Sequence, residues 1–365
     1  MNTASHLDLR DLSAGAVAGV LDGFSAEIAR GQMLAVVSPE AASLRTLIDL
    51  IAGFARPHHG RILLDGKDLA LRAPGERGFM SLRAHLALFP HLDARANIAF
   101  PLEQRGHDRA ECNNRLQRLV EEIGIAPDQL GLLPGALDPV MSLRVALARA
   151  LAGEPEVLLL ERPLQSLPSA ARRAFLPELK RLHRQFGITA LLATDDLAEA
   201  MALADSIIVL SGGRDVQRGR PDELFSKPAN AIVARLAGPC NLLPVDIVPG
   251  ETKIDVRSPL LQSGGGEMPR ERCHPGLGAG PALLLVRPEV VRPFLGIRRF
   301  DMLTDGSIVD VMPRGGAAQI RVAVDGLPAG IMAEIPLPSP FPLESGRRVT
   351  LGWNRTDSYL LPAEP

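Results

Sequence analysis

A phosphate-binding loop without its lysine is the feature that most constrains this chain. The apolar run Met33–Val37 predicts a short buried strand, and residues 44–54 predict a helix with one apolar face. Between such a strand and helix, phosphate-binding loops carry G-x-x-x-x-G-K-[ST], in which amides and the lysine hold phosphates and the hydroxyl binds magnesium. Residues 38–46, here called the phosphate loop, instead have the sequence SPEAASLRT.

The substitutions in the phosphate loop remove the groups that bind phosphate. Ser38 and Ser43 replace the glycines, Leu44 replaces the lysine, and Arg45, followed by Thr46, stands where the metal-binding hydroxyl belongs. Only four of the 40 basic residues are lysine, and none lies near the loop, so no small shift of alignment restores the missing group. The sequence predicts the scaffold of a nucleotide site without its chemistry.

Composition narrows the class of protein. With 365 residues and 46% apolar residues, the chain can form two or more domains with large cores. A net charge of -2 argues against a dedicated nucleic-acid binder. Cys112, Cys240 and Cys273 are scattered, which favours neither a disulfide scaffold nor a metal site. Because no run approaches 18 apolar residues, we expect no membrane-spanning helix.

The order of predicted elements indicates two domains. Strands alternating with helices over residues 1–236 predict an α/β fold, with a helical subdomain at about 93–152. Short β-like runs between Gly/Pro turns predict a small all-β barrel over residues 240–365. The glycine-rich stretch 264–280 predicts a flexible insertion within it.

Seven segments give the chain a resemblance to a known family. They are residues 50–54 (LIAGF), 60–66 (GRILLDG), 87–92 (ALFPHL), 144–151 (RVALARAL), 199–205 (EAMALAD), 241–244 (NLLP) and 286–289 (VRPE). Together they resemble the ATP-binding subunit of ABC importers of the maltose, polyamine, iron(III) and sulfate type. The resemblance implies a P-loop-NTPase-like nucleotide-binding domain with a helical insert, followed by a domain resembling an oligonucleotide/oligosaccharide-binding (TOBE) fold.

The family's catalytic positions are altered throughout. Ala84 stands in place of a glutamine, Glu161 of the metal-binding aspartate, Arg162 of the catalytic glutamate and Asp195 of the switch histidine. An arginine cannot act as a general base, and losing a general base alone typically costs ~10²–10⁴ in rate. Residues 12–20 also lack an aromatic side chain to stack on adenine.

The signature sequence of the family, Leu-Ser-Gly-Gly-Gln, is lost as well. The corresponding residues are Leu137, Asp138, Pro139, Val140 and Met141. Pro139 removes an amide from a helix start that would bind phosphate. In this family each ATP lies between the phosphate loop of one subunit and the signature of the other. Even a heterodimer with an active partner would therefore lack an intact site.

The resemblance also implies partners. Leu88, Phe89, Pro90 and His91 lie in the segment that receives a membrane permease in this family, although an ordinary loop with Leu88 and Phe89 in the core fits equally well. We expect permease subunits and a homo- or heterodimer with another ATP-binding subunit, and no nucleic acid. The location would be cytoplasmic, peripheral on the inner face of the cell membrane. The family uses ATP and Mg²⁺, whereas we expect no cofactor and no metal here.

Three functions remain open from the sequence. The first is a degenerate ATP-binding subunit, a pseudoenzyme with a structural or regulatory role in a solute importer. The second is an active ATP-hydrolysing subunit with atypical motifs. The third is a soluble regulatory protein that senses a ligand.

Charge replacement is expected to hold the altered site together. Arg45 and Glu161 would face each other across the position of the metal ion, so that the arginine replaces its charge. Arg162 and Asp195 would form a second pair, because the corresponding family residues converge on one phosphate.

Overall fold

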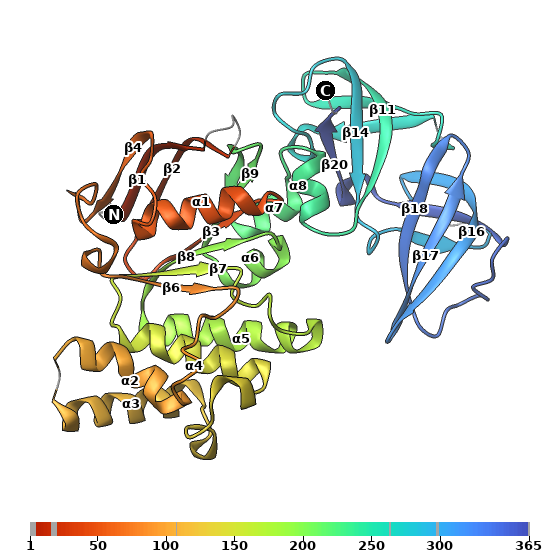
Figure 1. The fold of residues 1–365 in the computed structure, drawn as a ribbon. Coiled ribbons are helices and arrows are strands. Elements are labelled where there is room, and N and C mark those ends of the chain that lie inside the picture. Colours follow the sequence, from red (N-terminus) through yellow and green to blue (C-terminus); the bar gives the residue numbers. More distant parts are fainter. Residues whose placement is uncertain (1–4, 16–19, 107, 263, 297–298, 364–365) are drawn as a thin grey trace. The chain divides into compact units, whose positions relative to one another are not determined.

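The computed structural model describes residues 5–15, 20–106, 108–262, 264–296 and 299–363. The chain divides into two compact units, residues 1–221 and 222–365, and each is described by itself (Figure 1). The predicted separation of the domains at residues 236–240 stays a prediction. In the described part of the chain, no helix combines the length and apolarity that crossing a bilayer requires.

The first unit is built on a mostly parallel six-stranded sheet, in the order β10-β9-β3-β8-β7-β6. The strands are β3 (Met33–Val37), β6 (Phe79–Arg83), β7 (Val157–Glu161), β8 (Thr189–Thr194), β9 (Ser206–Ser211) and β10 (Arg214–Gly219). All five residues of β3 are buried, because both its faces are covered. Only β10 runs antiparallel to its neighbour.

A second, antiparallel sheet in this unit has the order β2-β1-β4-β5. Its strands are β1 (Ser5–Ala14), β2 (Leu21–Ala29), β4 (His59–Leu64) and β5 (Lys67–Asp68), of which β4 and β5 form a hairpin. Leu7 and Phe24 from this sheet, Leu47 from α1 (Ala41–Ala52) and Leu159 from β7 belong to one buried core. Helix α1 therefore lies between two sheets, which fixes the helix that follows the phosphate loop.

The remaining helices of the first unit include the predicted helical region. They are α2 (Ala94–Gln104), α3 (Arg109–Ile123), α4 (Pro139–Ala152), α5 (Ser169–Phe186) and α6 (Leu197–Leu203). Figure 1 shows α2, α3 and α4 grouped on one side of the six-stranded sheet. Helix α3 is capped by Asp108, whose side chain accepts from the Glu111 amide, and ends at Gly124 in the left-handed conformation.

The second unit is rich in β structure, as predicted, but its strands form two five-stranded antiparallel sheets where one small barrel was expected. The first sheet contains β11 (Asn241–Pro249), β12 (Lys253–Arg257), β13 (Gly265–Pro269), β14 (Gly280–Val286) and β20 (Ser358–Pro362). The second contains β15 (Arg292–Phe294), β16 (Met302–Arg314), β17 (Ala317–Val324), β18 (Leu327–Pro336) and β19 (Arg348–Trp353). Sequence locates strands but not their hydrogen-bonding partners.

The flexible insertion predicted at residues 264–280 is wrong for its first part. Gly265 and Gly266 begin β13, which pairs with β12. A Cβ atom on Gly265 would lie 1.8 Å from the Val256 carbonyl oxygen, and its φ of +139° suits glycine. These glycines therefore allow two strands to approach each other closely and do not form a flexible segment.

A buried arginine anchors the short helices α7 (Pro221–Ser226) and α8 (Ala231–Leu236) to the β structure of the second unit. Arg287 is 7% exposed. Its guanidinium donates to the carbonyl oxygens of Ala234, Gly238, Pro239 and Phe225 at 2.9–3.3 Å. The segment 286–289 that carried part of the family resemblance is therefore a structural anchor.

Candidate functional site

The altered catalytic positions meet at one edge of the parallel sheet. The phosphate loop follows β3, Ala84 follows β6, Glu161 ends β7 and Asp195 follows β8. Since β3, β8, β7 and β6 are neighbours in this order, their carboxyl ends lie side by side. Ligands of open α/β sheets bind at such an edge. The structure thus brings the predicted pocket residues to the place where a nucleotide site is expected.

Most of the phosphate loop is helical. Helix α1 starts at Ala41, whereas the sequence placed its start at Leu44, so only residues 38–40 remain between strand and helix. The physical reason is that Ala41, Ala42 and Ser43 replace residues of a glycine-rich loop. Glycine disfavours a helix, whereas alanine favours one, so the helix can begin earlier. The loop that would wrap around phosphates is therefore largely absent.

Leu44 points into the core rather than into a pocket. Its side chain is 1% exposed and belongs to the cluster that contains Leu47, Ile48 and Ile51. Arg45 points the other way and is 69% exposed. At the position of the phosphate lysine, the chain therefore has a core residue.

The polar side chains of the phosphate loop either form hydrogen bonds within the protein or are buried. Ser38 Oγ donates to Glu40 Oε2 at 2.6 Å, and the Gly212 amide donates to Glu40 Oε1 at 3.3 Å. The Glu40 carboxylate thus occupies donors beside the loop and adds negative charge that disfavours phosphate. Ser43 Oγ is buried and has no hydrogen-bond partner among the described residues.

The predicted pair between Arg162 and Asp195 is confirmed. Arg162 Nη2 donates to Asp195 Oδ2 at 2.8 Å. The side chains are 25% and 43% exposed, so this pair is a partly solvated contact worth about 0.2–1 kcal/mol. Arg162 also has a φ of +47°, a left-handed conformation that costs energy in a non-glycine residue.

The predicted pair between Arg45 and Glu161 is wrong. Arg45 Nε lies 3.9 Å from Asp49 Oδ2, one turn further along α1. Glu161 is instead approached by Arg83, whose Nη1 lies 3.5 Å from Glu161 Oε2. Arg83 Nη2 also donates to Asp49 Oδ1. The sequence identified the charge replacement but chose the wrong arginine, because Arg45 projects outward from α1 whereas Arg83 lies opposite Glu161 on the neighbouring strand.

Residues 137–141, predicted to correspond to the signature, do form a helix start, but that start is already capped. Asp138 precedes α4, and its carboxylate accepts from the Met141 amide at 2.9 Å. Pro139 has no amide hydrogen to offer. The helix therefore carries its own anionic cap, and an external phosphate would have to displace or approach a carboxylate. Leu137 and Val140, half-buried beside this cap, add no polar side-chain group.

One buried acid lies next to the site. Glu199 on α6 is 4% exposed and accepts from Thr194 Oγ1 at 3.0 Å. Burial raises the pKa of Glu199 to about 7. From the sequence, Glu199 was noted only as part of the segment 199–205 that resembles the family. Nothing in its spacing indicated that the side chain is buried.

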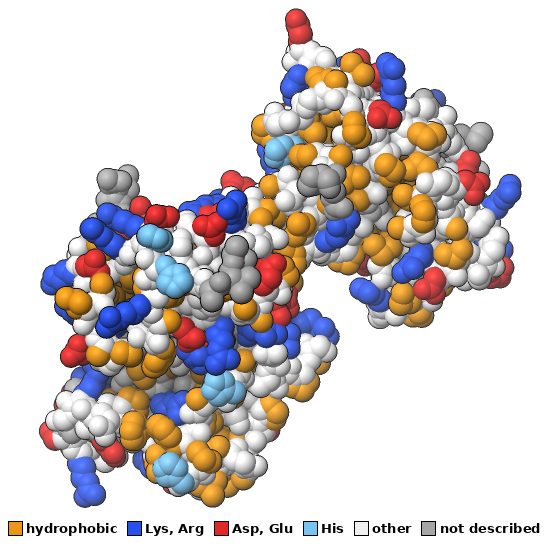
Figure 2. All heavy atoms as spheres, turned by 45° about the horizontal axis from the view of Figure 1, so that its top comes forward, with side chains coloured by type: hydrophobic (Ala, Val, Ile, Leu, Met, Phe, Trp, Pro, Cys, Tyr) orange, Lys and Arg blue, Asp and Glu red, His pale blue; other side chains and the backbone are white. Residues whose placement is uncertain are grey.

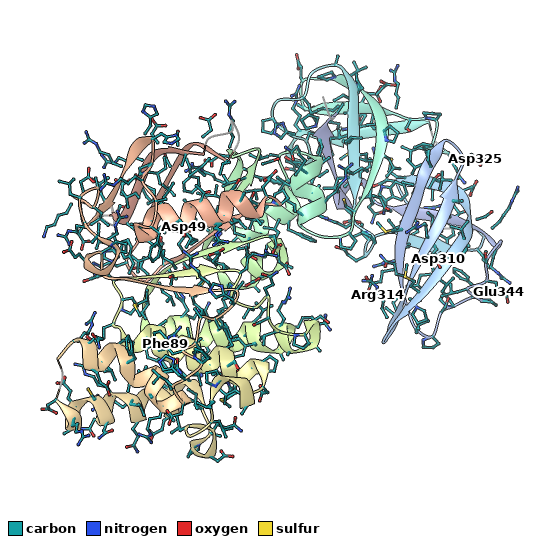
Figure 3. All side chains as sticks on the ribbon, in the orientation of Figure 1. Asp49, Phe89, Asp310, Arg314, Asp325 and Glu344 are labelled. Atoms are coloured by element: carbon teal, nitrogen blue, oxygen red, sulfur yellow. The ribbon has the colours of Figure 1, made fainter. Side chains whose placement is uncertain are left out.

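A groove beside the site contains part of the predicted permease surface. Its volume is about 440 Å³, and its lining includes Phe54, Phe89, Phe100 and Arg149. Phe54 is 65% exposed and Phe100 is 38% exposed. The Phe89 ring packs on Phe100 with ring centroids 4.8 Å apart. Phe89 is labelled in Figure 3 beside the helical region.

Of the four residues predicted for this surface, only Phe89 lines the groove. Leu88 is half-buried, and Pro90 and His91 are exposed. The sequence missed two residues that hold the loop. Buried Asn97 bonds to both the amide and the carbonyl of Phe89, and Arg149 lies 5.1 Å from its ring centroid.

Neither ATP nor Mg²⁺ fits the residues present. For ATP, the phosphate loop is mostly helical and Leu44 is in the core. For Mg²⁺, Glu161 already faces the Arg83 guanidinium, and an exposed arginine replaces the hydroxyl ligand. Thr46, half-buried within α1, makes no side-chain hydrogen bond among the described residues. Residues 16–19, part of the segment expected to lack an adenine-stacking aromatic, lie outside the described residues.

Charge on the visible surface is mixed. Figure 2 shows Lys and Arg side chains intermingled with Asp and Glu over both units on that face. Such a distribution differs from the continuous basic stripe typical of nucleic-acid binders.

Comparisons with known proteins agree with the fold. A family model described as ABC transporter matches residues 21–165. The sulfate/thiosulfate import ATP-binding protein CysA 2 of Chromobacterium violaceum is 34% identical over 318 residues, 86% of this chain and 83% of that protein. The spermidine/putrescine import ATP-binding protein PotA of Thermotoga maritima is 35% identical over 273 residues, 75% of this chain and 73% of that protein.

A solved structure gives the same fold. The protein cbiO1 from Clostridium perfringens, described as part of the ABC transporter complex cbiONQ, matches with a TM-score of 0.56 and 24% identity. The match covers 61% of this chain and 92% of that one. The α/β nucleotide-binding fold predicted from the sequence is therefore confirmed.

Proposed function

The chain belongs to the family of ATP-binding subunits of ABC importers, and within it we propose that this subunit binds ATP poorly and does not hydrolyse it. It serves a solute importer as a structural or regulatory component. The observation that carries the proposal is the buried position of Leu44, 1% exposed in the core where the family has its phosphate lysine.

Independent changes at the sheet edge and at the signature support the proposal. Arg162, paired with Asp195, places a cation where a general base is needed. Glu40 adds a carboxylate next to the loop, and Asp138 caps α4 with another. Electrostatic stabilisation of the transferred phosphoryl group is usually the largest contribution to such catalysis, and these changes reverse or remove it.

The groove around Phe89 supports a role in an importer. A half-open apolar hollow with exposed aromatic rings suits a short amphipathic helix of a partner protein. We propose that a membrane permease subunit occupies it, which would place the chain at the inner face of the cell membrane. A second ATP-binding subunit would complete the assembly, as in the dimeric cassette bound to ADP and Pi that shares this fold.

The likeness to named relatives favours a second candidate, an active ATP-hydrolysing subunit with atypical motifs. Relatives at 34–35% identity are called import ATP-binding proteins. An active subunit would have to expose Leu44 and release Arg83 and Arg162 from their acids when nucleotide binds. Hydrolysis by the purified chain, alone and with its permease, decides between the two candidates.

The partner is tested separately. Phe89→Glu places a charge in the groove and should abolish co-purification with a permease, while lowering the unfolding temperature only modestly because the ring is half-buried. His91→Glu is the matched control, because His91 is exposed on the same loop and does not line the groove. Retained co-purification by Phe89→Glu would argue against this surface.

A further inference from the structure

Asp49 and Glu161 share a single guanidinium. Asp49 lies on α1, as Figure 3 shows, and Glu161 ends β7, next to Arg83 in the register of β6 and β7. Arg83 Nη2 donates to Asp49 Oδ1, and Arg83 Nη1 lies 3.5 Å from Glu161 Oε2. The three side chains are only 15–26% exposed. One cation thus connects carboxylates from two separate elements.

The cation is needed because the two acids lie in poorly solvated surroundings. Like charges held close together and away from water repel more strongly than at the surface. Arg45 offers little compensation, since it is 69% exposed and its Nε is 3.9 Å from Asp49 Oδ2. Arg162 is already paired with Asp195. Arg83 is therefore the main neutralising group of this cluster.

Phe54 covers a further side of the guanidinium. Its ring centroid lies 5.6 Å from Arg83 Cζ, a distance at which a cation is attracted to the ring face. The arginine is thus held by two acids and an aromatic ring, which fixes its place better than one ion pair would.

We propose that Arg83 is a built-in cation that replaces the magnesium ion of this site. A guanidinium does not lose its proton in a protein, so the neutralisation is permanent and excludes the metal. The inference rests on the proposed function and deepens it, because it explains how the site stays folded without nucleotide or Mg²⁺.

The proposal has a consequence that a purely structural arginine would not have. Without the guanidinium, Asp49 and Glu161 become an uncompensated acidic pair. Mg²⁺ is bound by one or two carboxylates and retains several waters, so this pair has the ligands to acquire it. Removal of Arg83 should convert a metal-independent fold into one that Mg²⁺ stabilises.

The experiment measures thermal unfolding of the full chain with and without MgCl₂, at matched ionic strength. Wild type and Arg83→Lys, which keeps the charge, should show no shift with Mg²⁺. Arg83→Gln should unfold on the order of 5 °C lower, and Mg²⁺ should recover at least half of that loss. Arg214→Gln removes an arginine from an exposed pair with Asp22 and is the matched control without a Mg²⁺ response.

A double variant keeps the test decisive. Asp49→Asn combined with Arg83→Gln leaves only one carboxylate, so it should be more stable than Arg83→Gln alone and should lose the Mg²⁺ response. If Arg83→Gln does not fold, the double variant should still fold. An Arg83→Gln protein that is destabilised but indifferent to Mg²⁺, or a double variant no more stable than the single, overturns the proposal. ATP hydrolysis does not enter this test, so its outcome and that of the proposed function are distinguishable.

Discussion

Replacing Leu44 by lysine restores the family residue and therefore tests whether this position faces a phosphate pocket or the core. The Leu44 side chain is 1% exposed and packs among Leu47, Ile48 and Ile51. Removing a leucine from such a core costs about 2–5 kcal/mol. A lysine retains an aliphatic stem, but its ammonium group must be buried or drawn out to water.

We expect Leu44→Lys to lose about 3–5 kcal/mol of stability, or about 6–20 °C in unfolding temperature for a unit of this size. Leu44→Met is the control and should cost less than about 1.5 kcal/mol, because it conserves volume and apolarity. Circular dichroism during heating measures both, and calorimetry with ATP and Mg²⁺ measures binding. A Leu44→Lys protein with wild-type stability and newly acquired nucleotide binding would refute the core position of this side chain.

Three further variants test other parts of the structure. Burial raises the pKa of Glu199 from 4.5 to about 7, so the folded chain binds this proton more tightly than the unfolded chain does. The free energy of unfolding therefore falls as pH rises through that range, by up to about 3 kcal/mol. Glu199→Gln should remove this fall in urea titrations at several pH values. An unchanged pH profile would show that Glu199 titrates normally. Arg287→Met should lower the free energy of unfolding by about 3 kcal/mol, because four carbonyl oxygens lose their donor. It should also expose residues 222–240 to limited proteolysis, and wild-type protease resistance would contradict the anchoring role of Arg287. Arg162→Ala should cost less than about 1 kcal/mol in denaturant unfolding, since Asp195 remains 43% exposed, and a loss above about 3 kcal/mol would mean that the pair is desolvated.

The sequence predicted the elements of the site well, because buried strands and amphipathic helices have strong periodic patterns. The buried run at β3 appears where expected, and parallel strands necessarily bring their carboxyl ends together. The pair between Arg162 and Asp195 was expected from the family resemblance, and the structure shows why it forms, since both residues directly extend adjacent strands.

The sequence could not predict details that depend on which side chains meet in space. Arg45 lies on the face of α1 opposite the buried Leu44, so it meets Asp49 one turn further along instead of Glu161. Arg83 was missed because an arginine that ends a strand gives no signal until its neighbours in space are known. The same holds for Asn97 and Arg149, whose roles depend on the loop that they hold.

Isothermal titration calorimetry of the wild-type chain with ATP, in the presence and absence of Mg²⁺, tests the central claim most directly. The account predicts binding weaker than millimolar, no effect of Mg²⁺, and no phosphate release above background in the same samples. Saturable Mg²⁺-dependent binding accompanied by turnover would contradict it, and would identify the chain as an active ATP-binding subunit whose loop rearranges around the nucleotide.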